Sequence, residues 1–380
     1  MLLVQPSLQP PGGGNGVAAW MLQALAPVHR VTVLTWRPLE IRSIDRFFGT
    51  SLASLRFDSL IVPGAWTVLP DHLPVPAALI RSALLMRYTR RISADFDVIV
   101  GVHNEADYGR RSIQYVHYPT YLRPRPQVDL RWYHKPESLL RGYYALADRL
   151  ADFSLERMKS NLTLANSNWT AAKIERSLGI KARTLYPPVI DPAPPQSWDE
   201  RRPGFLAIGR ISPEKEYERV MRILAQVRRT EPRITLTIVG TSDRHVANYC
   251  RRLRELATSL GSWVEFRDDL SRDQVAALMA SLRYGIHGMR EEHFGMAPAE
   301  MVRAGMIVWV PNGGGQVEIV SDEPSLVFDS DEEAVEKIVR IVGDTHEQQR
   351  LRDQLAARGE SFGTTRFVAE IRTIVACFEV

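Results

Sequence analysis

The stretch YPPVIDPAPPQSWDERRPG, residues 186–204, divides the sequence into two parts of similar length. It carries six prolines. Proline has no backbone N–H and interrupts helices and sheet ladders, so the stretch predicts a linker, with a boundary between residues 191 and 201. A chain of 380 residues also exceeds one ordinary core and suits two domains. We therefore expect an N-terminal domain over residues 1–193 and a C-terminal domain over residues 194–362.

Short β-rich runs alternate with helical patterns on both sides of this linker. Such alternation is typical of parallel sheets whose strands are joined by crossover helices, so each part is expected to form a doubly wound, Rossmann-like α/β domain. The two domains are expected to face each other across a ligand cleft. The predicted strands are residues 2–4, 31–36, 97–102, 112–118, 162–167, 204–210, 234–240, 263–268, 284–288, 306–311 and 325–329.

The last residues, 363–380, have apolar side chains at helical spacing, at Phe367, Val368, Ile371, Ile374 and Val375. This spacing predicts a packed terminal helix. We expect this helix to pack back towards the N-terminal domain.

The composition is that of a globular protein, with 45% hydrophobic and 24% charged residues. Two cysteines, Cys250 and Cys377, provide neither a disulfide framework nor a four-cysteine metal site. The first residues lack the basic start of a signal peptide, and no window approaches the ~18 uncharged apolar residues of a spanning helix. A cytoplasmic location is the expectation.

Charge is distributed unevenly along the chain. Residues 1–193 carry 23 Lys and Arg against 15 Asp and Glu, whereas the remainder carries 25 against 29. Two stretches of the basic part, residues 76–91 and 121–135, mix apolar and basic side chains. They are interpreted either as solvated faces over a helical core or as a surface for anionic lipid or an anionic acceptor. No nucleic-acid partner is expected, because no aromatic-rich basic platform is present.

A glycine-rich loop, PPGGGNG, follows the first predicted strand and precedes a helix. Its backbone N–H groups, with Gly13 and Gly14 at the centre, can receive a phosphate or a sugar oxygen at the helix N-terminus. The loop is neither a strict dinucleotide fingerprint nor a Walker loop. The alternative interpretation is a flexible turn without a ligand.

The first strand of the C-terminal part ends in GRISPEK, residues 209–215. Gly209 permits close approach of a ligand to the backbone, and Arg210 and Lys215 supply two cations for phosphate oxygens. The alternative is that Lys215 and its neighbour Glu214 start an exposed helix.

A third motif, REEHFGMAPAEMVRAG at residues 290–305, surrounds the start of another helix. The backbone N–H groups of Phe294, Gly295 and Met296 are expected to be donors of its first turn. Glu300 lies in an apolar run, where an ionised carboxylate can accept from the two hydroxyls of a ribose. Glu292 is expected to accept from hydroxyls of a second sugar. Acids that favour the positive end of a helix are the alternative.

Taken together, these motifs resemble the retaining family-four glycosyltransferases of the GT-B fold. The resemblance rests on the two glutamates eight positions apart around Phe-Gly, on GRISPEK, and on NGGGQVEIV at residues 312–320. GGGNG, LANSNWTAAKI (164–174) and LYPPV (185–189) extend it through the N-terminal part. YVHYPT (115–120) and GIHGMREEHFGMAPAEM (285–301) are similar to the eukaryotic mannosyltransferases that extend a dolichol-linked oligosaccharide from GDP-mannose.

The resemblance implies a metal-independent transfer of a hexose from a nucleotide diphosphate sugar, without a cofactor. Arg210 and Lys215 would hold the diphosphate, Glu300 the ribose, and Glu292 the sugar. His117 would reach the sugar or the reacting face. Retention in the family is ascribed to front-face displacement, so no nucleophile of the enzyme is required. The expected donor-binding residues are Gly13, Gly14, Gly209, Arg210, Lys215, Phe294, Gly295, Met296 and Glu300.

The expected acceptor is a glycan or a lipid-linked sugar, bound by a protein that rests on the inner face of a membrane. A UDP-sugar-dependent transferase of the same family, a sugar-nucleotide 2-epimerase and a non-catalytic binding subunit are the alternatives. Residues 329–334, DSDEEA, contain an Asp-x-Asp pattern known from metal-diphosphate sites. The pattern is interpreted as a helix start capped by Asp331.

Overall fold

The computed structural model describes residues 1–64, 66, 78–120, 137–192, 194, 196–241 and 246–379. The chain forms two compact units. Unit 1 comprises Met1–Pro188 and Phe367–Val380, and unit 2 comprises Val189–Arg366. The two units divide between residues 188 and 189, five residues before the domain boundary expected between residues 193 and 194.

Unit 1 contains a parallel sheet of seven strands in the order β3-β2-β1-β4-β5-β6-β7. The chain leaves β1 on one side and returns to β4 on the other, which is the arrangement of a doubly wound sheet. The strands are β1 (Leu2–Val4), β2 (Thr32–Thr35), β3 (Asp58–Ile61), β4 (Ile99–Gly101), β5 (Ile113–Val116), β6 (Leu162–Ala165) and β7 (Arg183–Thr184).

Unit 2 contains a parallel sheet of six strands in the order β10-β9-β8-β11-β12-β13. Its order switches in the same way, between β8 and β11. The strands are β8 (Arg202–Ile208), β9 (Thr235–Gly240), β10 (Val264–Asp268), β11 (Leu282–Ile286), β12 (Ile307–Pro311) and β13 (Val327–Phe328).

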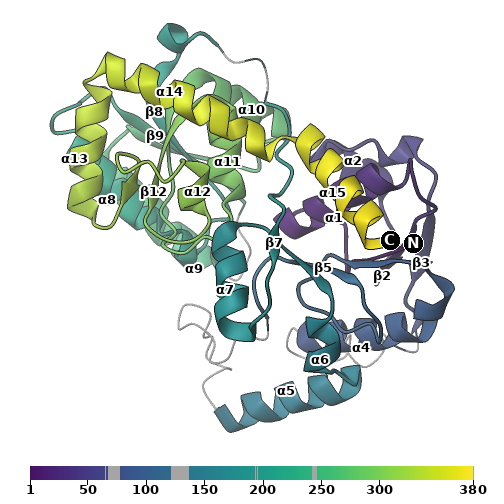
Figure 1. The fold of residues 1–380 in the computed structure, drawn as a ribbon. Coiled ribbons are helices and arrows are strands. Elements are labelled where there is room, and N and C mark those ends of the chain that lie inside the picture. Colours follow the sequence, from purple (N-terminus) through teal and green to yellow (C-terminus); the bar gives the residue numbers. More distant parts are fainter. Residues whose placement is uncertain are drawn as a thin grey trace. The chain divides into compact units, whose positions relative to one another are not determined.

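Helices cover both faces of the unit 1 sheet (Figure 1). Successive strand residues point to opposite faces. Leu3 therefore packs with α1 and α15, whereas Leu2 and Val4 pack with α4 and α5. The helices of unit 1 are α1 (Gly13–Leu25), α2 (Ile41–Phe48), α4 (Ala78–Ile92), α5 (Glu137–Ala151), α6 (Leu155–Lys159), α7 (Asn168–Leu178) and most of α15 (Thr364–Glu379).

The helices of unit 2 follow its strands in alternation, as the sequence pattern predicts. Apolar side chains of α8, among them Val220, Ile223 and Leu224, are fully buried. The helices are α8 (Tyr217–Val227), α9 (Ala247–Leu260), α10 (Arg272–Ser281), α11 (Met296–Arg303), α12 (Gln316–Ile319), α13 (Asp331–Val342) and α14 (Thr345–Gly359).

The eleven predicted strands are confirmed, and two edge strands, β3 and β7, were not predicted. Three of the four residues of β3 are exposed, so it lacks the apolar pattern of a buried strand. The pairing of β7 covers two residues, Arg183 and Thr184. Such short or polar edge strands leave little signal in a sequence.

The C-terminal helix α15 is part of the core of unit 1. Phe367, Ile371, Ile374 and Val375 are buried in the same cluster as α1 and β1. The Nε of Arg372 also donates a hydrogen bond of 2.7 Å to the carbonyl of Ala24, near the end of α1. The last helix thus completes the hydrophobic core of the unit that contains the N-terminus.

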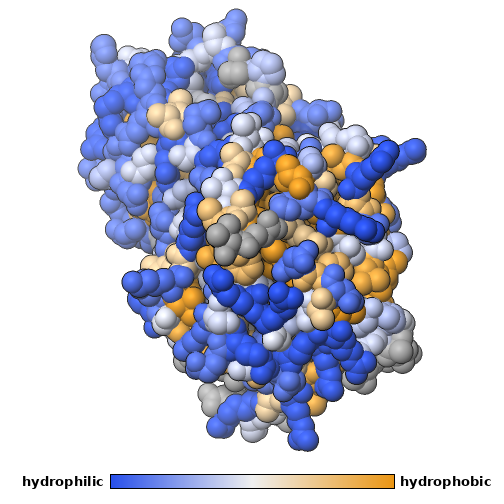
Figure 2. Space-filling model, turned by 45° about the vertical axis from the view of Figure 1, so that its right-hand side comes forward, coloured by the Kyte–Doolittle hydropathy of each residue, from blue (hydrophilic) through white to orange (hydrophobic). Residues whose placement is uncertain are grey.

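Figure 2 shows hydrophilic side chains over most of one face, with apolar side chains in small groups between them. Among the described residues, no helix has the length and the apolar character needed to span a bilayer. Residues 121–135 lie outside the described part of the chain, and residues 76–91 are described from residue 78, where they form α4.

Candidate functional site

The loops after β8, β11 and β12 carry the unit 2 motifs. These three strands are neighbours and parallel, so their carboxyl ends meet at one edge of the sheet. Ligands of open parallel sheets bind beyond this edge, at the point where the strand order switches. The sequence GRISPEK follows β8, and HGMREEHFG follows β11.

Glycines let the loops after β8 and β11 approach each other. A Cβ atom on Gly288 would lie 2.5 Å from the carbonyl oxygen of Lys215, and one on Gly209 would lie 3.1 Å from the hydroxyl of Tyr217. Lys215 ends a short 3₁₀ turn, Pro213–Lys215, and Glu216 then has a φ of 49° before α8 begins. This backbone brings Lys215 against the end of β11.

Lys215, Glu292 and His287 form a compact charged cluster. The Nζ of Lys215 lies 2.5 Å from Oε2 of Glu292 and 3.4 Å from Sδ of Met289. The Nε2 of His287 lies 3.1 Å from the same oxygen of Glu292. The side chains of Lys215, Glu292 and His287 are 15%, 18% and 4% exposed, so the cluster is mostly shielded from water.

Burial and charge oppose each other in this cluster. Burial raises the pKa of Glu292, but the hydrogen bond from His287 and the charge of Lys215 outweigh it and hold that pKa well below its ordinary value. Burial also lowers the pKa of His287, with Glu292 opposing this shift. At neutral pH the cluster is therefore an ionised carboxylate between an ammonium and a neutral imidazole.

The backbone of residue 292 is fixed from the opposite side by the loop after β12. Gly314 has a φ of 76°, and a Cβ atom there would lie 1.9 Å from the carbonyl oxygen of Glu292. That oxygen accepts a hydrogen bond of 2.8 Å from the N–H of Gly315. The buried amide of Gln316 donates to the carbonyls of Met289, Pro311 and Gly313. The two loops are thus joined through backbone contacts.

Arg210 lies outside this cluster. Its side chain is 66% exposed, and its Nη2 lies 3.4 Å from Glu214. Such an exposed pair contributes little to stability and leaves the guanidinium accessible to an anion. The structure therefore brings Lys215 and Glu292 together and keeps Arg210 at the surface of the same loop.

The helix α11 begins at Met296, one residue after the start expected around Gly295. Gly295 precedes it with a φ of 105°, and a Cβ atom there would lie 3.1 Å from Cδ1 of Ile319. The ring of Phe294 is buried against Phe362, with centroids 5.6 Å apart. The Phe294 side chain thus belongs to the core, and only its backbone remains a candidate for ligand contact.

Glu300 is half-buried on α11 and accepts no hydrogen bond from the described residues. Burial raises the pKa of its carboxyl to about 7, and the nearby charge of Arg272 opposes this shift. Arg272 is the first residue of α10 and was not predicted as a site residue. A carboxylate kept in this state gains stability when a ligand donates hydrogen bonds to it.

The unit 1 motifs also converge. A Cβ atom on Gly14 would lie 3.0 Å from Nε2 of His117, so the glycine loop and the histidine are in contact. The Nε2 atom of His117 also lies 3.0 Å from the carbonyl oxygen of Val102, and the backbone N–H of His117 donates to Oδ1 of Asn104. Gly13 is the first residue of α1, so Gly13 and Gly14 lie in the first turn of this helix and not in a loop before it.

His287 is the site residue that sequence reasoning missed. It lies between an apolar strand and a glycine, and a histidine in such a run is usually interpreted as part of the core.

The prediction that Asp331 caps α13 was wrong. Ser330 has the extended backbone of an N-cap and accepts the N–H of Glu333, whereas Asp331 pairs with the buried Arg219.

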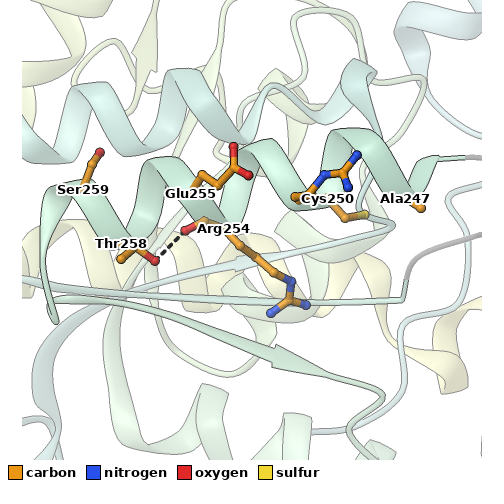
Figure 3. A pocket seen from close by; sticks show the side chains of 7 residues that line it. Ala247, Cys250, Arg254, Glu255, Thr258 and Ser259 are labelled. Atoms are coloured by element: carbon orange, nitrogen blue, oxygen red, sulfur yellow. Dashed lines mark hydrogen bonds between the residues drawn. The ribbon is translucent and has the colours of Figure 1, made fainter.

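A separate hollow lies along α9 (Figure 3), lined by Ala247, Cys250, Arg251, Arg254, Glu255, Thr258 and Ser259. Several of its polar groups are already engaged by neighbouring residues. The hydroxyl of Thr258 donates to the carbonyl of Arg254, and the guanidinium of Arg254 pairs with Asp268. Within the described ranges, no group of three or more His, Cys, Asp or Glu side chains is placed to hold a metal ion.

Residues 193–360 match the family model described as "Glycosyl transferases group 1". The match contains the carboxyl ends of β8, β11 and β12 with Lys215, His287, Glu292 and Glu300. The match lies within unit 2.

Two curated relatives are named as mannosyltransferases. The chain is 27% identical over 241 residues to the Dictyostelium discoideum protein named "GDP-Man:Man(3)GlcNAc(2)-PP-Dol alpha-1,2-mannosyltransferase", which covers 57% of the chain and 48% of that relative. The human protein of the same name is 28% identical over 222 residues, covering 52% and 44%. The chain thus spans about half the length of the curated relatives it matches.

Solved structures match both units. Anabaena HepE, solved with UDP and glucose, has a TM-score of 0.70 at 17% identity and covers 99% of each chain. WaaG, a glycosyltransferase involved in lipopolysaccharide biosynthesis, has a TM-score of 0.63 at 17% identity and covers 94% of this chain and 95% of its own. These likenesses concern the fold. The chain has the GT-B fold, with two Rossmann-like domains built on parallel sheets, as the sequence predicts.

Proposed function

We propose that this chain is a retaining glycosyltransferase that transfers a hexose from a nucleotide diphosphate sugar to a glycan or lipid-linked acceptor. The observation that carries the proposal is the Lys215–Glu292–His287 cluster at the switch point of the unit 2 sheet, inside the matched domain. Lys215 and Arg210 supply positive charge where negative charge develops on the leaving diphosphate. Glu292 and Glu300 supply acceptors for hydroxyls of the sugar and of the ribose.

The first choice of donor is GDP-mannose. The curated relatives that the chain matches are named for GDP-mannose, whereas HepE is solved with UDP. A thermal-shift comparison of GDP-mannose, UDP-glucose and ADP-glucose tests the choice, because a ligand that binds the folded state raises its stability by mass action. We expect GDP-mannose to give the largest shift. A larger shift with UDP-glucose would support the UDP-dependent alternative.

The chemistry itself requires a turnover assay. Incubation of GDP-mannose with a lipid-linked mannosyl acceptor should give a new mannoside with the α configuration of the donor, visible in the one-bond carbon–proton NMR coupling at its anomeric carbon. The rate should persist in EDTA, since two cationic side chains serve the diphosphate. Inversion at C2 of the donor without an acceptor would instead identify an epimerase.

We also propose that unit 1 receives the acceptor and that its basic surface rests on the anionic inner face of a membrane. A pocket at the ends of α4 and α5 is lined by Arg87, Arg90, Arg91, Arg149 and Asp152. Arg91 stacks over Trp66 at 4.7 Å, and Arg149 makes no ion pair with a described residue. Basic side chains near an anionic surface contribute ~1 kcal/mol each. Sedimentation should therefore occur with phosphatidylserine vesicles and fail with phosphatidylcholine vesicles.

A further inference from the structure

One oxygen of the Glu292 carboxylate is fully engaged while the other is open. Oε2 receives both Lys215 and His287, at 2.5 and 3.1 Å. Oε1 accepts no hydrogen bond from a described residue. An ionised carboxylate offers acceptor sites on both oxygens, so Oε1 retains its full capacity for a hydroxyl donor. The cluster therefore orients one oxygen and leaves the second for a ligand.

The imidazole of His287 is placed to donate this hydrogen bond permanently. Its ring lies at the end of β11 and is 4% exposed, and its backbone N–H is bonded to the carbonyl of Trp309 on β12. Burial favours the neutral ring. Since ionised Glu292 only accepts, the proton of the neutral ring lies on Nε2.

The positive charge of Lys215 serves two partners, the carboxylate of Glu292 and, under the proposed function, the donor diphosphate. In the structure the ammonium of Lys215 neutralises Glu292. Under the proposed function the same ammonium must also attract the donor diphosphate. A buried carboxylate that loses its counter-charge is strongly destabilised unless other donors remain. His287 is such a donor, and it comes from a different strand end than Lys215.

We propose that His287 is a positioning residue, which holds Glu292 ionised and oriented for a sugar hydroxyl while the ammonium of Lys215 is shared with the donor diphosphate. The proposal rests on the proposed function for its substrate class. It assigns His287 no contact with the sugar or the diphosphate. His287 acts through Glu292 and thereby makes the charge of Lys215 available.

Two substitutions separate the hydrogen bond from the volume of the ring. His287→Leu removes the donor, and His287→Gln keeps an N–H near the position of Nε2. With GDP-mannose and a lipid-linked mannosyl acceptor, we expect His287→Leu to lower kcat/KM by ~10- to 100-fold, the effect of one hydrogen bond to a charged group. His287→Gln should recover most of this loss. His346→Leu, which removes an exposed imidazole on α14 in the same unit, should leave kcat/KM unchanged.

The acid limb of the pH profile of kcat/KM tests the role of His287, because a purely structural role of this residue would leave that limb unchanged. The titratable groups that act on Glu292 are Lys215 and His287, and Tyr217 lies within its field. Without His287, burial opposes a single partner, so the pKa of Glu292 rises. The acid limb of kcat/KM should move to higher pH by about one unit or more in His287→Leu and stay in place in His287→Gln.

The same shift is measurable without substrate. A folded pKa below the ordinary value gives Glu292 a contribution to stability that is lost as pH falls through that pKa, so acid unfolding of unit 2 should begin at higher pH in His287→Leu than in His287→Gln. The proposal would be overturned if the two variants had the same acid limb of kcat/KM and began to unfold at the same pH. It would also be overturned if both variants lost the same factor in kcat/KM. Absence of turnover in the wild-type protein would contradict the proposed function, and the substrate-free comparison would still decide the role of His287.

Discussion

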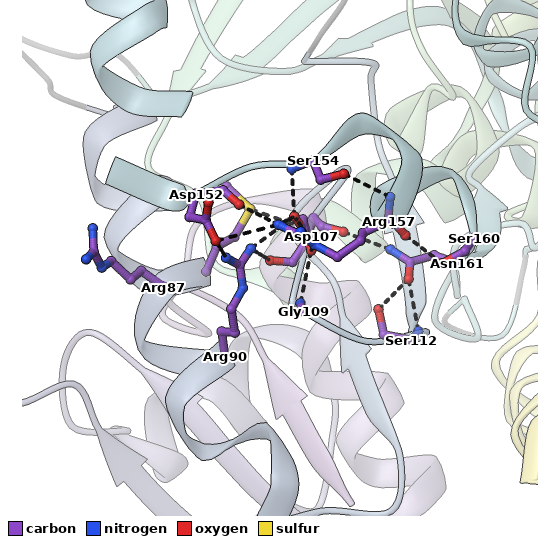
Figure 4. A network of polar contacts seen from close by, with 12 residues as sticks. Arg87, Arg90, Asp107, Gly109, Ser112, Asp152, Ser154, Arg157, Ser160 and Asn161 are labelled. Carbon is purple, nitrogen blue, oxygen red and sulfur yellow. Dashed lines mark hydrogen bonds and ion pairs between the residues drawn. The ribbon is translucent and has the colours of Figure 1, made fainter. Parts of the chain in front are cut away.

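Asp107 in unit 1 and Glu292 in unit 2 are both carboxylates whose pKa is lowered by neighbouring cations and hydrogen-bond donors, and they differ in how many of their oxygens are engaged. The side chain of Asp107 in unit 1 is 1% exposed. Its carboxylate forms ion pairs with Arg157 and Arg90 and accepts from the N–H groups of Gly109 and Ser154 (Figure 4). Both of its oxygens are engaged. In unit 2, the described residues donate hydrogen bonds to only one carboxylate oxygen of Glu292, Oε2.

The two carboxylates differ at Oε1 of Glu292, which accepts no hydrogen bond from a described residue. Their electrostatics are alike. Burial raises the pKa of both Asp107 and Glu292, but hydrogen bonds and neighbouring cations more than offset this rise, so both pKa values lie below the ordinary value. A carboxylate whose oxygens are all engaged can only stabilise the fold. One with a free oxygen at a strand end can also bind a ligand. Asp107 therefore serves the fold, whereas Glu292 keeps the open oxygen that the proposed sugar contact requires.

The largest expected effect is on turnover, in Lys215→Ala. Removing a cation that faces developing charge typically costs ~10²–10³-fold in kcat, about 2.7–4 kcal/mol. The measurement is the initial rate at saturating GDP-mannose and acceptor. Lys181→Ala, an exposed lysine of unit 1, is the matched control and should keep the wild-type rate. A wild-type rate in Lys215→Ala would remove this residue from the diphosphate site.

The next effect is on stability, in Asp107→Asn. Loss of the buried charge leaves Arg90 and Arg157 without their shared partner, which should cost about 3 kcal/mol in the unfolding of unit 1. Urea titration followed by tryptophan fluorescence measures this difference. The rate per folded molecule should not change. Asp152→Asn removes a 77% exposed carboxylate from the same Arg90 and should cost less than ~1 kcal/mol.

The pH dependence of this difference follows from the direction of the shift. Because the folded pKa of Asp107 lies below its ordinary value, its stabilising contribution is present above about pH 4 and is lost as pH falls through the folded pKa. The gap between wild type and Asp107→Asn should therefore be constant at neutral pH and narrow only below about pH 4. A gap that grows on acidification would contradict the structural role.

A smaller effect is expected at Glu300, where Glu300→Gln removes the charge and keeps the shape. Hydrogen bonds to a charged acceptor contribute ~1.5–3 kcal/mol, so the affinity for GDP-mannose should fall by about tenfold or more, with a smaller change in the saturated rate. Isothermal titration calorimetry measures the affinity. An unchanged affinity would argue against contact between Glu300 and the ribose.

The wild-type affinity should also depend on pH near neutrality. The pKa of Glu300 is raised to about 7, and the ionised form is the better acceptor of two hydroxyls. Affinity for GDP-mannose should therefore be highest above pH 7 and decrease as pH falls through 7 and the carboxylate is protonated. Glu300→Gln should remove this dependence, and a slope retained in the variant would assign it to another group.

The sequence predicted the fold well because parallel strands carry continuous apolar runs. The runs at residues 31–36 and 204–210, for example, both form strands. The prediction failed at β3 and β7, whose pairing depends on a neighbouring strand and not on their own side chains. It also placed the cap of α13 one residue late, since Ser330 and Asp331 are both good capping residues and the pairing with Arg219 spans 112 residues.

The site was predictable where a short motif carries the chemistry. GRISPEK and Glu-x7-Glu identified Lys215 and Glu292, and the structure brings both into one ion pair. His287 was missed because its partner is fixed by the loops and not by its own pattern. The Asp107 network was missed for the same reason, since its bond to Arg157 joins positions 50 residues apart.

The smallest effect on kcat is expected for a substitution among the glycines at the start of α1 in unit 1, because it removes no charged side chain. A Cβ atom in Gly14→Ala would lie 3.0 Å from Nε2 and 3.3 Å from Cε1 of His117, so the ring must move by a few tenths of an ångström. A shift of that size should reduce kcat several-fold, well below the ~10²-fold cost of a 1 Å misplacement. Gly142→Ala, on an open surface of α5, is the matched control and should change neither rate nor stability appreciably. A Gly14→Ala rate equal to that of the control would show that the position of His117 does not limit the reaction, and it would confine the sensitive groups to the charged edge of unit 2.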